Sequence, residues 1–138
     1  MDQTKSIELL NEDLEMEYRS IVQYIQHLAV AKGAEYQAVS EAVRPHVKQE
    51  LEHATTLAEQ IDFLGGVPTT NVPDVPSETD TRRAFALDLE LEEQQLERYR
   101  ERYEQATEAG LPDVAEALRP LLEQTQDHVR DLQSALDK

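Results

Sequence analysis

Four long helix-favouring stretches, separated by glycine and proline, dominate the sequence. The stretches are rich in Glu, Gln, Ala, Leu and Arg, and aromatic residues make up only 5% of the chain, which is typical of an all-α protein. Gly33, Gly65 and Gly110 stand where helices are expected to stop, and Pro112 suits the first turn of the last helix. The predicted helices span Thr4–Lys32, Tyr36–Leu64, Thr79–Ala109 and Pro112–Leu136.

The connections between these helices differ in length, and the difference predicts the topology. Short turns after the first and third helices make antiparallel hairpins. The linker 65–78 holds three prolines, which exclude a helix there, and it is long enough to travel the length of a bundle. We therefore expect an all-α, up-down-down-up four-helix bundle with one long crossover between helices two and three.

The two predicted hairpins resemble each other. One constant shift along the chain aligns EAVRPHVKQELEH with EALRPLLEQTQDH, and DLEMEYRSIVQY with DLELEEQQLERY. We interpret residues 1–138 as a single domain in which a hairpin is repeated, at 7–61 and again at 82–136. Pro45 and Pro120 lie inside the helical pattern of the two copies, where we expect each to remove one backbone hydrogen bond and to start or kink a helix.

The chain is strongly acidic, with a net charge of -16. This charge argues against nucleic acid as a partner, because phosphate binding needs clustered Lys and Arg. The acidic surface either only keeps the protein soluble or also draws cations towards a site. The sequence has no Cys, no signal-peptide start and no apolar run of membrane-spanning length. We therefore expect a cytoplasmic protein with no membrane partner, whose metal ligands would be Glu, Asp or His.

Each predicted helix has a seam of residues spaced by three and four positions, which is expected to face the core. Ionisable residues interrupt all four seams near mid-height, and neither Lys nor Arg accompanies them there. A buried carboxylate is costly unless it is paired, protonated or bound to a metal. Oxygen and nitrogen ligands suit iron, manganese or zinc. The candidate metal ligands are Glu17, Glu50, His53, Glu92 and His128.

The equivalent segments QELEH and QTQDH differ in one residue that matters for metal binding. Glu50 and His53 share one helical face, because they are one turn apart, and can bind the same ion. The interval from Glu17 to Glu50 equals the interval from Glu92 to Thr125. Thr125 therefore stands where a second such Glu is expected. Three central carboxylates do not neutralise two divalent ions, so the second position is either completed by a bound anion or weak and empty.

These residues resemble the ferritin-like diiron carboxylate superfamily, and in particular its bacterioferritin and rubrerythrin-type members. The similarity covers residues 6–136 and is carried by NEDLEMEYRSIVQYIQH, ELEHATTLAEQIDFLGGVP and DLELEEQQLERY. The superfamily takes one Glu from each of two helices and a Glu-x-x-His from each of the other two. The resemblance implies one metal position at Glu17, Glu50 and His53, and another at Glu92 and His128.

The chain also departs from the family pattern. Thr125 replaces the second bridging Glu, which leaves five of the six implied ligands. Leu51 stands where haem-binding bacterioferritins have Met, so we expect no haem. The chain ends soon after His128, without the fifth helix of cage-forming ferritins, which argues against a 24-subunit cage. We expect a homo-oligomer instead, with an antiparallel dimer as the simplest form.

Other residues are expected near the centre. Tyr24 and Tyr99 follow their Glu by two turns, and they have either a redox or hydrogen-bonding role or an ordinary place in the core; Tyr24 is the candidate catalytic residue. Side chains near enough to support or replace the ligands are His46, Gln49 and Gln124. Asp127 is expected to point away from the face of His128, and His27 to pack or to be solvated.

Three functions are compatible with this reading of the sequence. The leading hypothesis is an iron-binding protein whose non-haem diiron carboxylate centre oxidises ferrous iron with O2 or peroxide, as a ferroxidase. It would hold two iron ions, or only one, with manganese or zinc as alternatives. The second hypothesis is a non-enzymatic metal-binding or structural bundle with one firm metal site. The third is a small peroxidase or oxidase, which would need an organic substrate and a channel to the centre.

Overall fold

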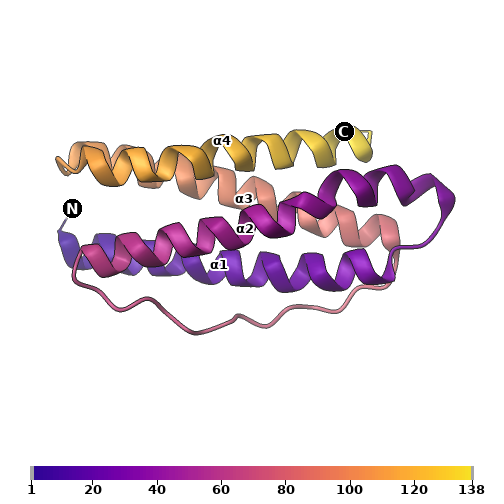
Figure 1. Cartoon of the computed structure of the whole chain (residues 1–138), viewed down its shortest axis with the longest axis horizontal. Coiled ribbons are helices and arrows are strands. Elements are labelled where there is room, and N and C mark those ends of the chain that lie inside the picture. Colours follow the sequence, from indigo (N-terminus) through magenta and orange to yellow (C-terminus); the bar gives the residue numbers. More distant parts are fainter. Residues whose placement is uncertain (1, 138) are drawn as a thin grey trace.

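A computed structural model describes residues 2–137 as a bundle of long helices (Figure 1). A short 3-10 helix, η1, lies in the connection between the first two. No helix among these residues is long and apolar enough to cross a membrane. The elements are α1 (Gln3–Val30), η1 (Ala34–Tyr36), α2 (Gln37–Phe63), α3 (Thr81–Glu108) and α4 (Pro112–Ala135).

The topology is the predicted one. Helices α1 and α2 form one antiparallel hairpin, and α3 and α4 form the other (Figure 1). Both α1 and α4 pack against α2 and α3, so each helix has two main neighbours. Because the chain returns along the bundle after α2, helices α2 and α3 run in the same direction (Figure 1). The prediction of an up-down-down-up bundle with one long crossover is therefore confirmed.

The crossover between α2 and α3 lies along α1 and is tied to it at several points. Near its start, the Thr69 N–H donates to Asn11 Oδ1 at 2.8 Å, and the Tyr18 hydroxyl donates to the Thr69 carbonyl at 2.9 Å. Near its end, the Glu78 N–H donates to Gln26 Oε1 at 3.2 Å. These hydrogen bonds satisfy backbone groups that the prolines of the crossover keep out of a helix.

The helix ends agree with the prediction to within two residues. The sequence pattern predicts that α3 begins at Thr79, but the helix begins at Thr81 because Asp80 is its cap. The Asp80 side chain accepts a hydrogen bond from the Arg83 N–H at 3.0 Å, as expected for an acidic residue at this position. Gly33 lies beyond α1 and has a φ of 102°, which favours glycine. The helix itself ends earlier than predicted, at Val30, because Ala31 has already left the helical conformation.

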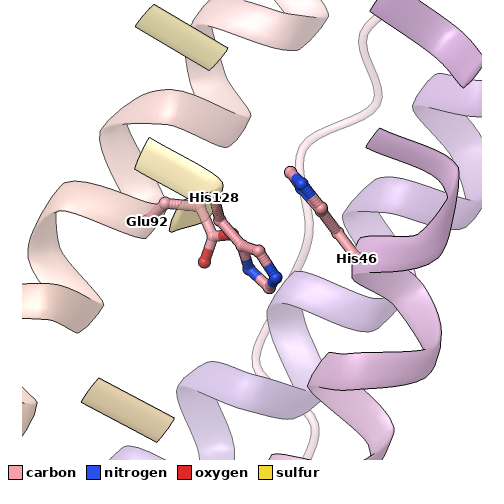
Figure 2. Close-up of side chains that lie close together, drawn as sticks. All are labelled: His46, Glu92 and His128. Carbon is pink, nitrogen blue, oxygen red and sulfur yellow. The ribbon is translucent and has the colours of Figure 1, made fainter. Parts of the chain in front are cut away.

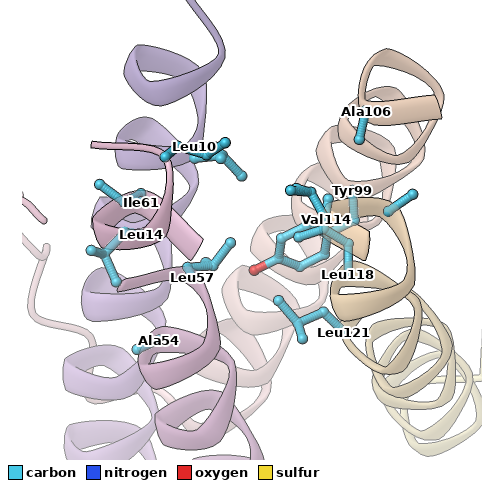
Figure 3. Packing of buried hydrophobic residues seen from close by; sticks show 12 residues of the cluster. Leu10, Leu14, Ala54, Leu57, Ile61, Tyr99, Ala106, Val114, Leu118 and Leu121 are labelled. Atoms are coloured by element: carbon cyan, nitrogen blue, oxygen red, sulfur yellow. The ribbon is translucent and has the colours of Figure 1, made fainter. Parts of the chain in front are cut away.

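The hydrophobic core is divided into two clusters, one towards each end of the bundle. The first joins the start of α1 and α4 to the end of α2 and α3 (Figure 3), and it includes Leu10, Leu14, Leu57, Ile61, Val114 and Leu118. The second joins the opposite ends of the same helices, and it includes Val39, Val43, Phe85, Leu89, Leu132 and Leu136. A layer of buried polar side chains lies between the two clusters.

Candidate metal centre

The buried polar layer brings the five predicted ligands together from all four helices. Glu17 comes from α1, Glu92 from α3 and His128 from α4, while α2 supplies two side chains one turn apart. Each of the five is no more than 1% exposed. They are Glu17, Glu50, His53, Glu92 and His128.

Glu50 lies in the middle of this group, between the two predicted histidine ligands. Its Oε2 is 3.4 Å from Nδ1 of His53, and its Oε1 is 3.2 Å from Nδ1 of His128. One carboxylate thus faces both imidazoles, each through a different oxygen. A carboxylate in this position is suited to bridge two metal ions.

Glu17 and Glu92 flank the group, and each is held by a tyrosine of the other hairpin. The Tyr99 hydroxyl donates to Glu17 Oε1, and the Tyr24 hydroxyl donates to Glu92 Oε2 at 3.0 Å. Gln95 also donates to Glu17 Oε1, at 2.8 Å. The second oxygen of each carboxylate, Oε2 of Glu17 and Oε1 of Glu92, is buried without a hydrogen-bond partner. Of the roles expected for the two tyrosines, the structure places both in hydrogen bonds to predicted ligands.

Two glutamines orient the predicted histidine ligands, and they do so across the two hairpins. Gln124 on α4 accepts a hydrogen bond from Nε2 of His53 on α2, at 2.7 Å. Gln49 on α2 accepts one from Nε2 of His128 on α4, at 2.5 Å. Because each Nε2 donates to a glutamine, each Nδ1 faces the carboxylates, and in the neutral imidazole it is the nitrogen whose lone pair can bind a metal. An imidazole that binds a metal is commonly oriented in this way by an oxygen acceptor.

The crowding of charges changes the protonation of this group in the metal-free protein. Burial, together with the neighbouring charges of Glu17 and Glu92, raises the pKa of Glu50 well above its usual range. Burial alone would lower the pKa of His53, but the Glu17 carboxylate, with Oε1 3.7 Å from Nδ1 of His53, raises the pKa above its ordinary value. Burial and the charge of Glu92 raise the pKa of Tyr24, so its hydroxyl keeps its proton and acts as a donor.

A sixth side chain, His46, completes a second group of possible ligands. The ligand atoms of Glu17, Glu50 and His53 lie within 4.8 Å of one another, and so do those of His46, Glu92 and His128. Figure 2 shows the second group, in which an imidazole of α2 approaches two side chains of the other hairpin. The sequence predicts that His46 lies near the centre but not that it lies beside Glu92, because helix periodicity does not show which neighbouring helix a side chain contacts.

Thr125 lies in the centre as predicted, and it leaves a ligand place open. Its side chain is completely buried, and its hydroxyl oxygen has no hydrogen-bond partner. The backbone of α4 thus brings residue 125 to the metal group, but the residue lacks a carboxylate. Asp127, slightly further along α4, is exposed, as predicted.

Two buried aspartates beside the centre are not among the core-facing residues predicted from the sequence. Asp13 pairs with Arg102, with 2.8 Å between Oδ2 and Nε, and Asp88 pairs with His27, with 2.8 Å between Oδ1 and Nδ1. His27 is therefore buried and paired rather than solvated. The two aspartates occupy equivalent positions in the two copies of the hairpin, and this repetition is the signal that identifies them. Arg102 compensates Asp13, and no salt bridge among residues 2–137 joins Lys or Arg to Glu17.

The donor set fits divalent metal ions. Buried polar atoms normally have hydrogen-bond partners, yet Oε2 of Glu17, Oε2 of Glu50, Oε1 of Glu92 and Nδ1 of His53 have none. All four are oxygen or nitrogen atoms of the kinds that bind iron, manganese or zinc. Metal binding would give these atoms partners and compensate the carboxylate charges.

Comparison with known proteins agrees with the geometry. A model of the ferritin-like domain matches residues 7–138. A ferritin-like, diiron-carboxylate protein of Bacillus anthracis str. Ames is 30% identical to this chain, with a TM-score of 0.91 over 99% of each chain. The bacterioferritin of Desulfovibrio desulfuricans is 25% identical, with a TM-score of 0.87 over 98% of this chain and 80% of that chain. No curated protein matches the sequence closely enough to count as a relative. The chain therefore belongs to the ferritin-like domain family.

Proposed function

We propose that this protein is a non-haem diiron protein that oxidises ferrous iron. One ion would be held by Glu17, Glu50 and His53, and the other by Glu92 and His128. The observation that carries the proposal is the position of Glu50, whose two oxygens face the two imidazoles at 3.4 and 3.2 Å. This arrangement favours two adjacent ions that share a carboxylate over a single isolated ion.

The names of the structural relatives support iron as the metal. One is described as a diiron-carboxylate protein and the other as a bacterioferritin with a diiron site in different catalytic states. The carboxylate-rich donor set of this chain is compatible with the same metal. Manganese and zinc remain alternatives that the donor atoms would also accept.

In the proposed reaction, ferrous iron is the substrate and O2 is the oxidant. Two ferrous ions give up one electron each, and O2 takes two electrons and two protons to leave as hydrogen peroxide. With peroxide as the oxidant, the same two electrons and two protons give two molecules of water. The residues of the protein supply the geometry: Tyr24 and Tyr99 hold the flanking carboxylates, and burial keeps bulk water away from the centre.

The chemistry of Glu50 follows from its raised pKa. Burial and the neighbouring carboxylates of Glu17 and Glu92 favour the protonated form of Glu50 in the metal-free protein. Binding of ferrous iron requires the carboxylate form, so metal binding by Glu50 would be accompanied by proton release.

A single metal ion with a structural role is the second candidate function, and Thr125 favours it. Without a carboxylate at residue 125, the position at Glu92 and His128 has fewer anionic ligands than the position at Glu17, Glu50 and His53. We do not expect a bundle that is stabilised by one ion at the first position to react with O2. The two candidates therefore differ in the number of ions bound and in reactivity.

Aerobic addition of ferrous iron to the metal-free protein tests the proposal. We expect ferric absorbance to grow faster than in buffer and to saturate near two iron ions per chain. Glu50→Gln should abolish the acceleration, because it removes the carboxylate that both positions share. Glu52→Gln is the matched control, since Glu52 is exposed on the same helix and its loss changes the charge equally. Ferric growth no faster than in buffer, with one ion bound per chain, would instead support the structural role.

A further inference from the structure

His46 is a buried imidazole that the proposed ligand set does not use. It lies on α2, one turn before Glu50, and is only 2% exposed. Its ring stacks on that of His128, with ring centroids 3.8 Å apart. The ligand atoms of His46, Glu92 and His128 lie within 4.8 Å of one another (Figure 2). His46 therefore lies beside Glu92 and His128, the two ligands of the proposed second position.

His46 has the same hydrogen-bonding pattern as the two predicted histidine ligands. Like His53 and His128, it directs Nε2 to an oxygen acceptor, in this case Oδ2 of Asp131 at 3.2 Å. A carboxylate on Nε2 leaves the lone pair on Nδ1, which faces the centre. His27, outside the centre, has the opposite arrangement: its Nδ1 contacts a carboxylate and its Nε2 has no partner. Three of the four histidines of the chain thus present the same nitrogen to one group of carboxylates.

Tyr24 connects His46 to the proposed second metal position. Its hydroxyl lies 3.2 Å from Nδ1 of His46 and 3.0 Å from Oε2 of Glu92. One hydroxyl proton is thus shared between two possible acceptors. When Nδ1 of His46 binds an ion, the proton remains with Oε2 of Glu92, whose other oxygen is buried without a partner. Both ligands are therefore able to bind metal without an unsatisfied donor being left behind.

We propose that His46 is a third ligand of the second ion, which is then held by His46, Glu92 and His128, so that an imidazole compensates for the carboxylate missing at Thr125. This assignment rests on the proposed diiron function and deepens it. The first position has two carboxylates and one imidazole, and the second has two imidazoles and one carboxylate of its own. The two positions therefore differ in chemistry, with Glu50 between them.

The unequal ligand sets predict unequal metal preferences. Imidazole ligands suit cobalt, zinc and iron, whereas carboxylates also suit manganese. The second position should accordingly discriminate against Mn²⁺ more strongly than the first. Replacing the imidazole by a carboxylate at this position should reduce that discrimination.

Titration of the metal-free protein with Co²⁺ tests the assignment, with calorimetry and the metal content per chain as readouts. The wild type should bind two ions. His46→Ala should keep the first and bind the second at least about tenfold more weakly, since even residues that only orient a ligand contribute this much. His46→Gln, which keeps a polar side chain of similar size, covers the case in which the alanine variant does not fold. His27→Gln is the matched control, because it removes a buried histidine outside the centre and should leave both ions bound.

A second substitution separates a ligand from a side chain that only supports the fold. The double variant His46→Ala with Thr125→Glu restores a donor to the second position from the other side and should recover the second ion. The ratio of Mn²⁺ affinity to Co²⁺ affinity should also be higher in the double variant than in the wild type. Two ions bound by both His46 variants with unchanged affinity would overturn the assignment, and so would a folded double variant that fails to recover the second ion. A wild type that binds only one ion would overturn the diiron function itself, and the assignment with it.

Discussion

The two glutamines that orient the histidines lead to a prediction that distinguishes this centre from two independent sites. Gln124 lies on α4, one turn before His128, yet it accepts the hydrogen bond of His53 on α2, at 2.7 Å. Gln124→Leu keeps a side chain of similar size but removes the acceptor. The substitution should therefore weaken the ion held by the α1–α2 hairpin, although the changed residue belongs to the other hairpin.

The size of this effect follows from the role of the hydrogen bond. Loss of an acceptor that orients a metal-binding imidazole typically lowers metal affinity by about 10- to 100-fold. This corresponds to about 1.4 to 2.8 kcal/mol. His53 is 1% exposed, so water does not readily replace the lost acceptor, and we expect a value within this range. Gln49→Leu should produce the mirror-image loss at the position of His128, since Gln49 accepts its Nε2–H.

Two measurements together identify which ion is affected. A calorimetric titration with Co²⁺ gives the two dissociation constants, and anomalous scattering from crystals of the loaded variant shows which position has lost occupancy. Gln126→Leu is the control, because Gln126 is exposed on the same helix as Gln124. A loss at the His128 position in Gln124→Leu, or equal affinities in all variants, would refute the crossed arrangement.

Two further predictions concern charge. Thr125→Glu adds a fourth carboxylate to the centre, so we expect calorimetry to show tighter binding of the second ion. Without metal, the variant should have a lower melting temperature, because the new carboxylate is buried. An unchanged dissociation constant for the second ion would contradict this prediction. Burial raises the pKa of Asp13 to about 6, against the opposing effect of Arg102 and Arg98. Between pH 3.8 and 6 the unfolded chain therefore releases a proton that the folded protein keeps, and the contribution of Asp13 to the free energy of unfolding falls by up to about 3 kcal/mol. Urea unfolding of the metal-free wild type and of Asp13→Asn at pH 4 and 6 gives the free energy of unfolding of both proteins. The stability of the wild type relative to Asp13→Asn should decrease as the pH rises.

Local sequence rules predict most of the fold, because helix formation here depends on local signals. Gly65 and Gly110 follow the ends of α2 and α3 with positive φ, the prolines of the crossover exclude a helix, and a linker of that length allows α2 and α3 to run parallel. The error at the start of α3 has a local cause, since Asp80 caps the helix slightly later than the pattern suggests. Pro45 and Pro120 each lie inside a continuous helix, so neither starts a new one.

The candidate centre is only partly predictable, because its details depend on contacts between helices. The seams place Glu17, Glu50 and Glu92 in the interior correctly, since burial follows from periodicity along one helix. The partner of each side chain does not follow in this way. The glutamine that supports His53 belongs to another helix, and His46 approaches ligands of the opposite hairpin. Comparison of the two hairpin copies gives the best prediction of these partners, because equivalent residues make equivalent contacts.

The tyrosine and glutamine hydrogen bonds of the centre have a consequence for how the chain folds. Tyr24 contacts Glu92, and Gln124 contacts His53, so these bonds join one hairpin to the other and none of them can form within a hairpin alone. Each hairpin consists of contacts that are close in sequence and can form early. These hydrogen bonds therefore form only when the finished hairpins dock. The ligands of the first position all lie on the α1–α2 hairpin, whereas those of the second come from α2, α3 and α4, so an ion at the second position favours the docked state directly.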